Sequence, residues 1–185
     1  MIIHTERLVL RPLTLTDAPD IQRLAGEREV AATTRDIEHP YEKGMAERWV
    51  ESCRRQSEAG ELVHFAITLA ADGTFMGAIT LHLDLAENGQ PGSPKQAELS
   101  YWVGKPFWNQ GYATEALQAV LDHAFHRLGF DRVYAAHFTR NPSSGRVMQK
   151  AGMLPEGFLK GHTEKWGSFE DLALYGVTRE QFLSG

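Results

Sequence analysis

The stretch from Trp108 to Thr114 places small residues where a loop is expected to enter a helix. Gly111 and Ala113 fall in the first turn, where little side-chain bulk lets a ligand approach the backbone. The first amides of a helix have no partner inside it, and the helix dipole adds about half a positive charge there. The segment is therefore either a pyrophosphate site or an ordinary loop before a helix. It is neither a Walker loop nor a dinucleotide fingerprint, because the lysine and further glycines of those motifs are missing.

A second helix start follows one expected strand later, at Asn141 and Pro142. Asparagine is a preferred N-cap and proline is favoured in the first turn, so the pair predicts a helix that ends at Ala151 and Gly152. Ser144 lies in the first turn of this helix. Taken alone, it is either a ligand contact or an ordinary first-turn serine.

Hydrophobic periodicity predicts the elements that carry these segments. A meander of three strands is expected over about 63–69, 75–83 and 97–104, with a turn at 71–74 and an exposed loop at 86–95. The elements expected before it are a strand at 7–12, a helix capped by Asp17 and a helix over about 42–58. Those expected after it are a helix over about 113–128, a strand at 132–138, the helix at Asn141, and strands at about 155–162 and 168–177. This order predicts a mixed α/β sheet with helices on both faces.

The composition is that of a folded domain. The 185 residues are 42% hydrophobic and 23% charged, which suits one domain.

No apolar run approaches the roughly 18 residues of a membrane helix, and the N-terminus lacks a secretory layout, so we expect a cytoplasmic protein that binds no membrane. The net charge of −5 disfavours nucleic acid. Cys53 is the only cysteine, and His123 and His126 have no evident third ligand, so we expect no metal site.

Four ordered motifs together resemble one family. They are TERLVLRP from Thr5, ELSYWV with WNQGYATEA from Glu98, NPSSGRVMQKAGM from Asn141, and DLALY from Asp171. They resemble the GNAT superfamily of acetyl-CoA-dependent N-acetyltransferases, and within it the Rim-type branch of bacterial ribosomal-protein N-terminal acetyltransferases. The resemblance covers almost the whole chain. It implies a single domain over 1–185 with the GNAT fold, a mostly antiparallel, twisted α/β (α+β) sheet in which one parallel strand pair splays open to receive the coenzyme.

The resemblance also implies roles for individual residues. Val103, on the splayed strand, would offer backbone groups to the pantetheine arm and the acetyl carbonyl, and Asn141 would hydrogen-bond the pantetheine. Ser144 would lie near the thioester sulfur and protonate or stabilise the leaving thiolate, whereas many GNAT enzymes use a tyrosine where this chain has Met148. The pyrophosphate would be bound by backbone amides of Asn109, Gln110, Gly111, Tyr112, Ala113 and Thr114.

Direct attack by a neutral amine requires a base whose strength depends on the amine. At pH 7, deprotonation costs about 1.4 kcal/mol for a peptide α-amino group and about 4.6 kcal/mol for a lysine. Glu164, expected between the last two strands, lies roughly where the Rim-type branch carries a glutamate proposed as base. Glu98 is expected on the same strand face as Ser100 and Trp102. For each glutamate, the alternative is a solvated or ion-paired surface residue.

The implied function is direct acetyl transfer from acetyl-CoA, the donor substrate, to a primary amine, without a metal. The resemblance favours a protein N-terminal amine as the acceptor. Similar sequences act on small-molecule amines, namely amino acids, polyamines or antibiotics, and that alternative stays open. A non-catalytic acyl-CoA-binding sensor would share the same fold and donor residues. A homodimer formed edge to edge is also consistent with this branch.

Overall fold

The computed structural model describes residues 1–84 and 91–185. Its centre is an eight-stranded sheet in the order β1-β2-β3-β4-β5-β6-β8-β7. All neighbouring strands are antiparallel except β5 and β6, which confirms the predicted mixed, mostly antiparallel sheet. The strands are β1 (Ile3–His4), β2 (Leu8–Arg11), β3 (Leu62–Leu69), β4 (Phe75–Leu83), β5 (Gln96–Val103), β6 (Arg132–Phe138), β7 (Leu154–Lys165) and β8 (Ser168–Thr178).

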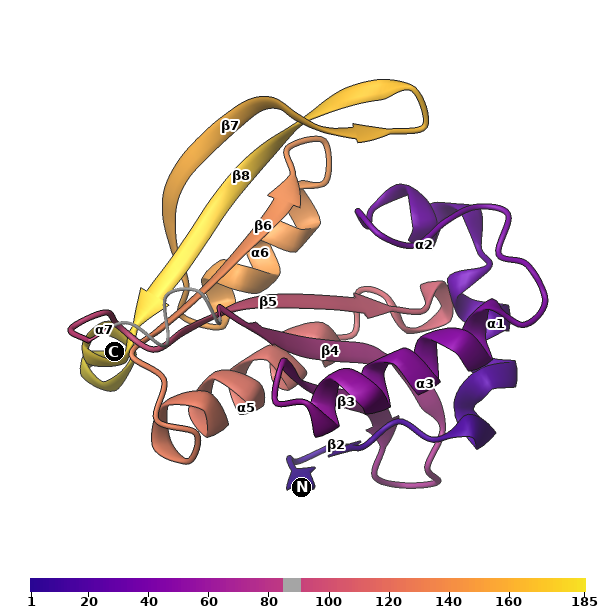
Figure 1. Cartoon of the computed structure of the whole chain (residues 1–185), viewed down its shortest axis with the longest axis horizontal. Helices are drawn as coiled ribbons and strands as arrows, with labels where there is room; N and C mark the ends of the chain where they lie inside the picture. Colours follow the sequence, from indigo (N-terminus) through magenta and orange to yellow (C-terminus); the bar gives the residue numbers. More distant parts are fainter. Residues whose placement is uncertain (85–90) are drawn as a thin grey trace.

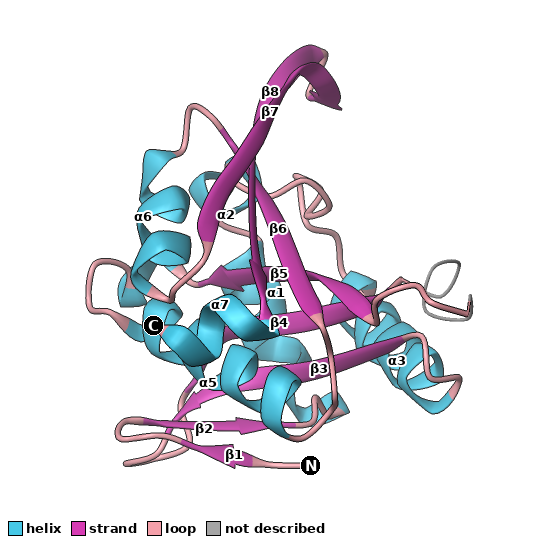
Figure 2. Ribbon diagram, turned by 90° about the vertical axis from the view of Figure 1, so that its left-hand side faces the viewer, coloured by secondary structure: helices cyan, strands magenta, loops and turns pink. Residues whose placement is uncertain are grey.

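Helices pack on both faces of the sheet, as the periodicity predicts (Figure 2). Strand β3 separates two cores, because Phe65 and Ile67 pack with the α5 side while Ala66 between them packs with α1 and α3. The α-helices of the described residues are α1 (Ala18–Ala25), α2 (Arg28–Ala32), α3 (Met45–Glu58), α5 (Tyr112–His126), α6 (Pro142–Lys150) and α7 (Arg179–Ser184).

The parallel pair opens along its length. Strands β5 and β6 are in register only from Gln96 opposite Arg132 to Glu98 opposite Tyr134. Beyond Glu98, β5 stays paired with β4 as far as Val103, while β6 stays paired with β8 as far as Phe138. The two strands therefore diverge, and Figure 1 shows β6 rising away from β5. This divergence is the predicted splay.

Several predicted boundaries shift. The helix expected over 42–58 begins at Met45, after Gly44 in a left-handed conformation. The helix expected over 113–128 ends at His126, and the last two strands are longer than expected. Periodicity did not predict β1, α2 or α7, because each of these elements is six residues or shorter. The loop expected at 86–95 falls partly outside the described residues.

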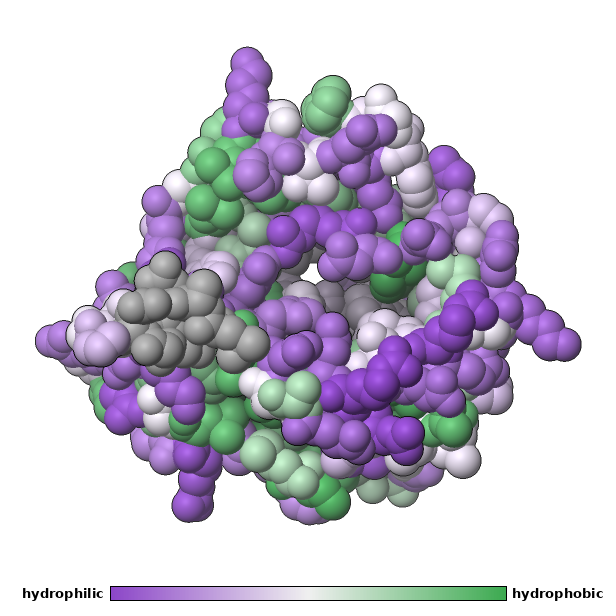
Figure 3. All heavy atoms as spheres, in the orientation of Figure 1, coloured by the Kyte–Doolittle hydropathy of each residue, from purple (hydrophilic) through white to green (hydrophobic). Residues whose placement is uncertain are grey.

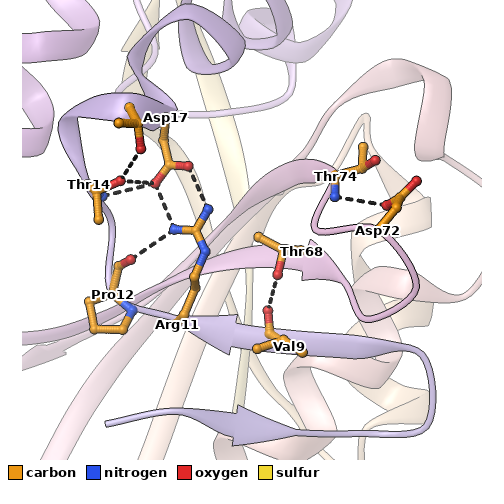
Figure 4. Close-up of polar contacts among 9 residues, drawn as sticks. Val9, Arg11, Pro12, Thr14, Asp17, Thr68, Asp72 and Thr74 are labelled. Carbon is orange, nitrogen blue, oxygen red and sulfur yellow. Dashed lines mark hydrogen bonds and ion pairs between the residues drawn. The ribbon is translucent and has the colours of Figure 1, made fainter.

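Asp17 occupies the predicted N-cap position of α1, but its side chain does not cap the helix. Its carboxylate accepts no hydrogen bond from that helix. It instead accepts hydrogen bonds from Arg11 Nη2 at 2.7 Å, Arg11 Nη1 at 2.9 Å and the Thr14 backbone N–H at 2.9 Å (Figure 4). Burial alone would raise the pKa of Asp17, but these bonds lower it below its ordinary value. The ion pair thus ties the end of β2 to the start of α1.

Candidate active site

A cavity of about 450 Å³ lies where β5 and β6 part. Strands β4, β5 and β6, helices α3 and α6, and the segment after α2 from Thr33 to Tyr41 contribute to its walls. Figure 3 shows the molecule hollowed near its centre, with hydrophilic residues around much of the rim. The cavity is therefore bounded by the splayed strands on one side and by the N-terminal helices on the other.

Two cationic side chains link the end of α2 and the segment after it to the C-terminal half of the chain. Lys165 Nζ donates a hydrogen bond to the Ile37 carbonyl at 2.8 Å. Arg140 Nη2 donates to the Ala32 carbonyl at 2.6 Å, and its Nε pairs with Glu170 at 2.9 Å. The hydrogen bonds to Ala32 and Ile37 join residues 108 and 128 positions apart in the sequence.

The loop before α5 has the backbone geometry of an anion site. Asn109 and Gly111 have φ values of 60° and 80°, the left-handed region that glycine and asparagine tolerate best. Glu115 is the first α5 residue whose N–H bonds within the helix, to the Gly111 carbonyl at 3.0 Å. The amides of Tyr112, Ala113 and Thr114 therefore remain available to a ligand. The predicted pyrophosphate loop has suitable geometry.

Thr5 and Arg7, from the N-terminal motif TERLVLRP, hold the loop before α5 in place through hydrogen bonds. Glu115 accepts hydrogen bonds from the Thr5 hydroxyl at 2.7 Å and the Arg7 backbone N–H at 2.8 Å, and it pairs with Arg7 Nε at 2.6 Å. Arg7 Nη1 also donates to the Gln110 carbonyl at 2.8 Å. Burial would raise the pKa of Glu115, but these donors lower it. Thr5 and Arg7 thus stabilise the geometry of a loop more than 100 residues away in the sequence.

Two other predicted coenzyme contacts lie at the ends of the splayed strands. Val103 ends β5, and its carbonyl accepts a hydrogen bond from Trp108 Nε1 at 2.7 Å. One of its two acceptor positions is therefore already used. Asn141 occupies the predicted N-cap position of α6, but its side chain makes no capping hydrogen bond. Its amide is left available to another partner.

Ser144 and Tyr101 meet on the α6 side of the opened strands. Tyr101 Oη lies 2.7 Å from Ser144 Oγ and 3.2 Å from the Ser144 carbonyl oxygen. Both residues line the cavity. Burial raises the pKa of Tyr101 to about 12, although the hydrogen bond to Ser144 opposes the shift. The phenol is therefore a neutral hydrogen-bond donor at physiological pH.

The opposite face of β5 carries a different set of polar groups. His82 Nε2 lies 3.0 Å from Ser100 Oγ, and both residues line the cavity. Glu98, one position along the same face, is ion-paired with Arg35 from the segment after α2. Glu98 lies within β5 rather than before it, at the last paired position of the parallel strands.

Glu164 lies apart from these groups. It belongs to β7 rather than lying between the last two strands as predicted, and it pairs in register with Phe169 of β8. Its side chain is exposed, and it does not line the cavity. The structure therefore brings Ser144 to the opened strands but leaves Glu164 on an outer surface.

The sequence patterns predicted no role for Tyr101, His82 or Arg35. The one sequence signal that bears on their positions is the period-two alternation of β5. It places the side chains of Tyr101 and Ser100 on opposite faces of the strand. Their partners lie 18 to 63 residues away in the sequence. No local spacing identifies such partners.

Within residues 1–84 and 91–185, no group of three or more His, Cys, Asp or Glu side chains could hold a metal ion. In the same ranges, no helix is both long and apolar enough to cross a membrane.

Comparisons with known proteins agree with this geometry. Residues 7–154 match the family described as acetyltransferase (GNAT) domain. The probable N-acetyltransferase YjcK of Bacillus subtilis is 31% identical, over 97% of this chain and 100% of that protein. A ribosomal-protein α-N-acetyltransferase, RimL, solved with coenzyme A, has a TM-score of 0.84 at 18% identity, over 96% of this chain and 98% of that one. Spermidine N-acetyltransferase from Vibrio cholerae, solved with CoA and spermine, has a TM-score of 0.80 at 19% identity, over 97% and 99%.

The opened parallel pair and the unpaired amides at the start of α5 offer backbone hydrogen-bonding groups to an extended anionic ligand. The chain belongs to the GNAT acetyltransferase family and is an acetyl-CoA-dependent N-acetyltransferase.

Proposed function

We propose that this enzyme acetylates the free α-amino group of a peptide or protein N-terminus. The proposal rests on how open the cavity is on the side of the N-terminal helices, where the acceptor amine would enter. The two carboxylates among its described lining residues, Asp36 and Glu38, are both exposed rather than buried. A small polycation held in a closed pocket would need buried, paired carboxylates. The N-terminus of an extended peptide, in contrast, needs a cavity that is open to solvent.

The donor half of the proposal uses the predicted coenzyme contacts. Amides from Asn109 through Thr114 would bind the pyrophosphate, supported by the left-handed loop and the dipole of α5. Val103 and Asn141 would contact the pantetheine from the two sides of the splay. Ser144 Oγ, hydrogen-bonded by Tyr101, would donate a hydrogen bond to the sulfur as the C–S bond breaks.

The transfer itself would be direct. The amine nitrogen attacks the thioester carbonyl, the C–N bond forms, and the thiolate leaves with the electron pair of the C–S bond. No protein nucleophile is required, because binding places amine and thioester together. The enzyme's contribution is orientation, removal of one amine proton and stabilisation of the thiolate.

A small cationic amine is the second candidate acceptor. Asp36 and Glu38 occupy the same cavity as the aromatic side chains of Tyr41, Trp49 and Trp102. Carboxylates next to aromatic rings suit an organic cation. A volume of about 450 Å³ also lies within the usual range of small-molecule sites.

Release of free CoA thiol from acetyl-CoA tests the proposal directly. The assay compares N-terminal peptides with polyamines, amino acids and aminoglycosides at equal concentrations. We expect the highest kcat/KM with a peptide whose α-amino group is free, and loss of turnover when that group is blocked. Turnover confined to polyamines would favour the second candidate. Tight acetyl-CoA binding without any turnover would favour a non-catalytic sensor.

We also propose that the enzyme forms a homodimer through the edge strand β7. Among the described strands, β7 is the last in the sheet and pairs with β8 alone. Exposed apolar side chains lie on the hairpin of β7 and β8, including Phe158 and Phe169. Sedimentation equilibrium of the full chain and of a Phe169→Glu variant measures the assembly. A wild-type monomer at micromolar concentration contradicts it.

A further inference from the structure

Two consecutive residues of β5 send hydroxyl groups to opposite faces of the opened strands. Tyr101 faces α6, where it meets Ser144 at 2.7 Å. Ser100 faces the N-terminal helices, where it meets His82 Nε2 at 3.0 Å. The register places Ser100 opposite Thr80 and Glu98 opposite His82, so all four side chains share one face. A hydrogen-bonded pair therefore lies on each side of the strand at the point where the splay begins.

Direct amine attack has different proton requirements on the two sides. The departing thiolate gains negative charge, so it needs a hydrogen-bond donor. The attacking amine must lose a proton, so it needs an acceptor. Tyr101 and Ser144 are both donors on one side. The other side requires a group that is unprotonated at working pH and that a bound amine can reach.

The carboxylates on that side are poor candidates. Asp36 and Glu38 line the cavity, but both are exposed on the segment after α2, and among the described residues neither is hydrogen-bonded to the opened strands. Glu98 is ion-paired with Arg35, and this pairing weakens it as a proton acceptor. Glu164 is exposed on β7 and does not line the cavity. His82, in contrast, lines the cavity and faces Ser100 with its Nε2 atom, and it retains an exposed surface through which a proton can leave.

We propose that His82 is the general base, and that it accepts the amine proton through the hydroxyl of Ser100. This inference rests on the proposed acetyl transfer. The substrate amine donates to Ser100 Oγ, whose own O–H donates to Nε2 of His82 in the tautomer protonated on Nδ1. As the C–N bond forms, one proton moves from the amine to Ser100 Oγ and the Ser100 proton moves to His82. The thiolate leaves with its electron pair, and His82 returns its proton to water.

The surroundings keep His82 neutral. Burial of the ring lowers the pKa of His82 below its ordinary value of 6.5, and Arg35 lowers it further. Glu98 and Asp36 act in the opposite direction, but the net shift is downward. Among the described residues, the titratable groups that face this side of the sheet or line the cavity there are Arg35, Asp36, Glu38, Tyr41, Cys53, His64, Glu98 and Tyr134. An imidazole in this setting is unprotonated at pH 7, as a general base must be.

The test compares three variants of the full-length enzyme in the CoA-release assay. His82→Gln preserves a hydrogen-bonding side chain but removes the titrating group, and Ser100→Ala removes the relay. His126→Gln is the matched control, because His126 is an exposed residue of α5 that pairs with Asp122. We expect kcat/KM at pH 7 to fall roughly 100-fold for His82→Gln and for Ser100→Ala, and to stay unchanged for His126→Gln. The dissociation constant for acetyl-CoA should stay unchanged in all three.

The pH profile identifies the group. Wild-type kcat/KM should rise with increasing pH, with an inflection below pH 6.5 that reports deprotonation of His82. The profile of His82→Gln should lack this inflection but keep the one that reports deprotonation of the amine. A histidine NMR titration of wild type should give the same pKa, and the His82→Gln spectrum should lack that signal. Free imidazole should partly restore the rate of His82→Ala, which has space for it.

Two results would overturn the assignment. If His82→Gln turns over at the wild-type rate with the low-pH inflection intact, His82 is not the base, although the proposed function stands. If wild type itself releases no CoA with any amine, the proposed function fails and the base assignment fails with it. Normal acetyl-CoA affinity in His82→Gln excludes misfolding as the cause of a lost rate.

Discussion

The Tyr101 hydroxyl lies 2.7 Å from Ser144 Oγ, which joins β5 to the first turn of α6 across the opened strands. Each hydroxyl has one proton, so the direction of this bond matters. If Tyr101 donates to Ser144 Oγ, the serine proton is free to point at the leaving sulfur. The buried phenol, with its pKa raised to about 12, remains protonated in that role. Tyr101 is therefore a positioning residue for Ser144.

Tyr101→Phe should lower kcat about tenfold, because one hydrogen bond of roughly 1.4 kcal/mol is lost from the transition state. Ser144→Ala should lower kcat by at least as much. The Tyr101→Phe/Ser144→Ala double variant should lose no more than Ser144→Ala alone, since Tyr101 acts through Ser144. Steady-state kinetics and acetyl-CoA titration measure these effects. Fully additive losses would show that the two hydroxyls act independently.

Gly111→Ala should weaken acetyl-CoA binding about tenfold. The added Cβ would meet Arg7 Nη2 at 3.2 Å, in a residue with φ of +80° where alanine is strained. Gly73→Ala is the matched control, since it has φ of +78° but no atom within 4 Å of the added Cβ. Both variants should lose about 1 kcal/mol of stability, and only Gly111→Ala should raise KM for acetyl-CoA. Equal coenzyme affinity in both would argue against a pyrophosphate site at this loop.

Asp17→Asn should reduce the free energy of unfolding by about 2 kcal/mol, because it removes charged hydrogen bonds from Arg11 and Thr14 in a buried site. The lowered pKa of Asp17 means that its contribution is present above its ordinary value of 3.8 and is lost as the pH falls through the folded-state pKa. Urea unfolding between pH 7 and pH 3 measures both effects.

Asp20→Asn is the control for that experiment. Asp20 and Arg23 form an exposed pair, with 46% and 58% of their side-chain surfaces accessible, so the change should cost less than about 0.5 kcal/mol. Wild type should lose more stability than Asp17→Asn on acidification. Parallel pH curves for these two proteins would contradict the role given to Asp17.

Gly145→Ala should destabilise the fold by about 1–2 kcal/mol, although alanine is usually favoured over glycine inside a helix. The added Cβ would lie 2.7 Å from His137 Nε2 and 3.1 Å from the Tyr175 hydroxyl. Gly157→Ala is the control, because its nearest contact is an ordinary 3.6 Å to Leu174. Chemical denaturation compares the two. A stabilised Gly145→Ala would mean that His137 moves aside without cost.

Local patterns in the sequence were sufficient for most of the fold. Period-two alternation predicts β3, β4 and β6 closely, and the apolar stripe from Ala116 to Phe125 predicts the buried face of α5. These features depend on near neighbours, since strand and helix periodicity repeat within a few residues. The glycine before α5 and the proline at α6 likewise mark helix starts that the structure contains.

The sequence by itself thus determined the family, the order of the elements and the loop suited to a pyrophosphate. Only the tertiary structure decided which side chains meet at the opening. Ser144 is hydrogen-bonded to Tyr101, His82 is hydrogen-bonded to Ser100, and Arg35 forms an ion pair with Glu98. The two residues of each pair lie far apart in the chain. Such partners depend on strand register and on the point where β5 and β6 part. These long-range features arise from the packing of the whole sheet, and no spacing within one segment encodes them.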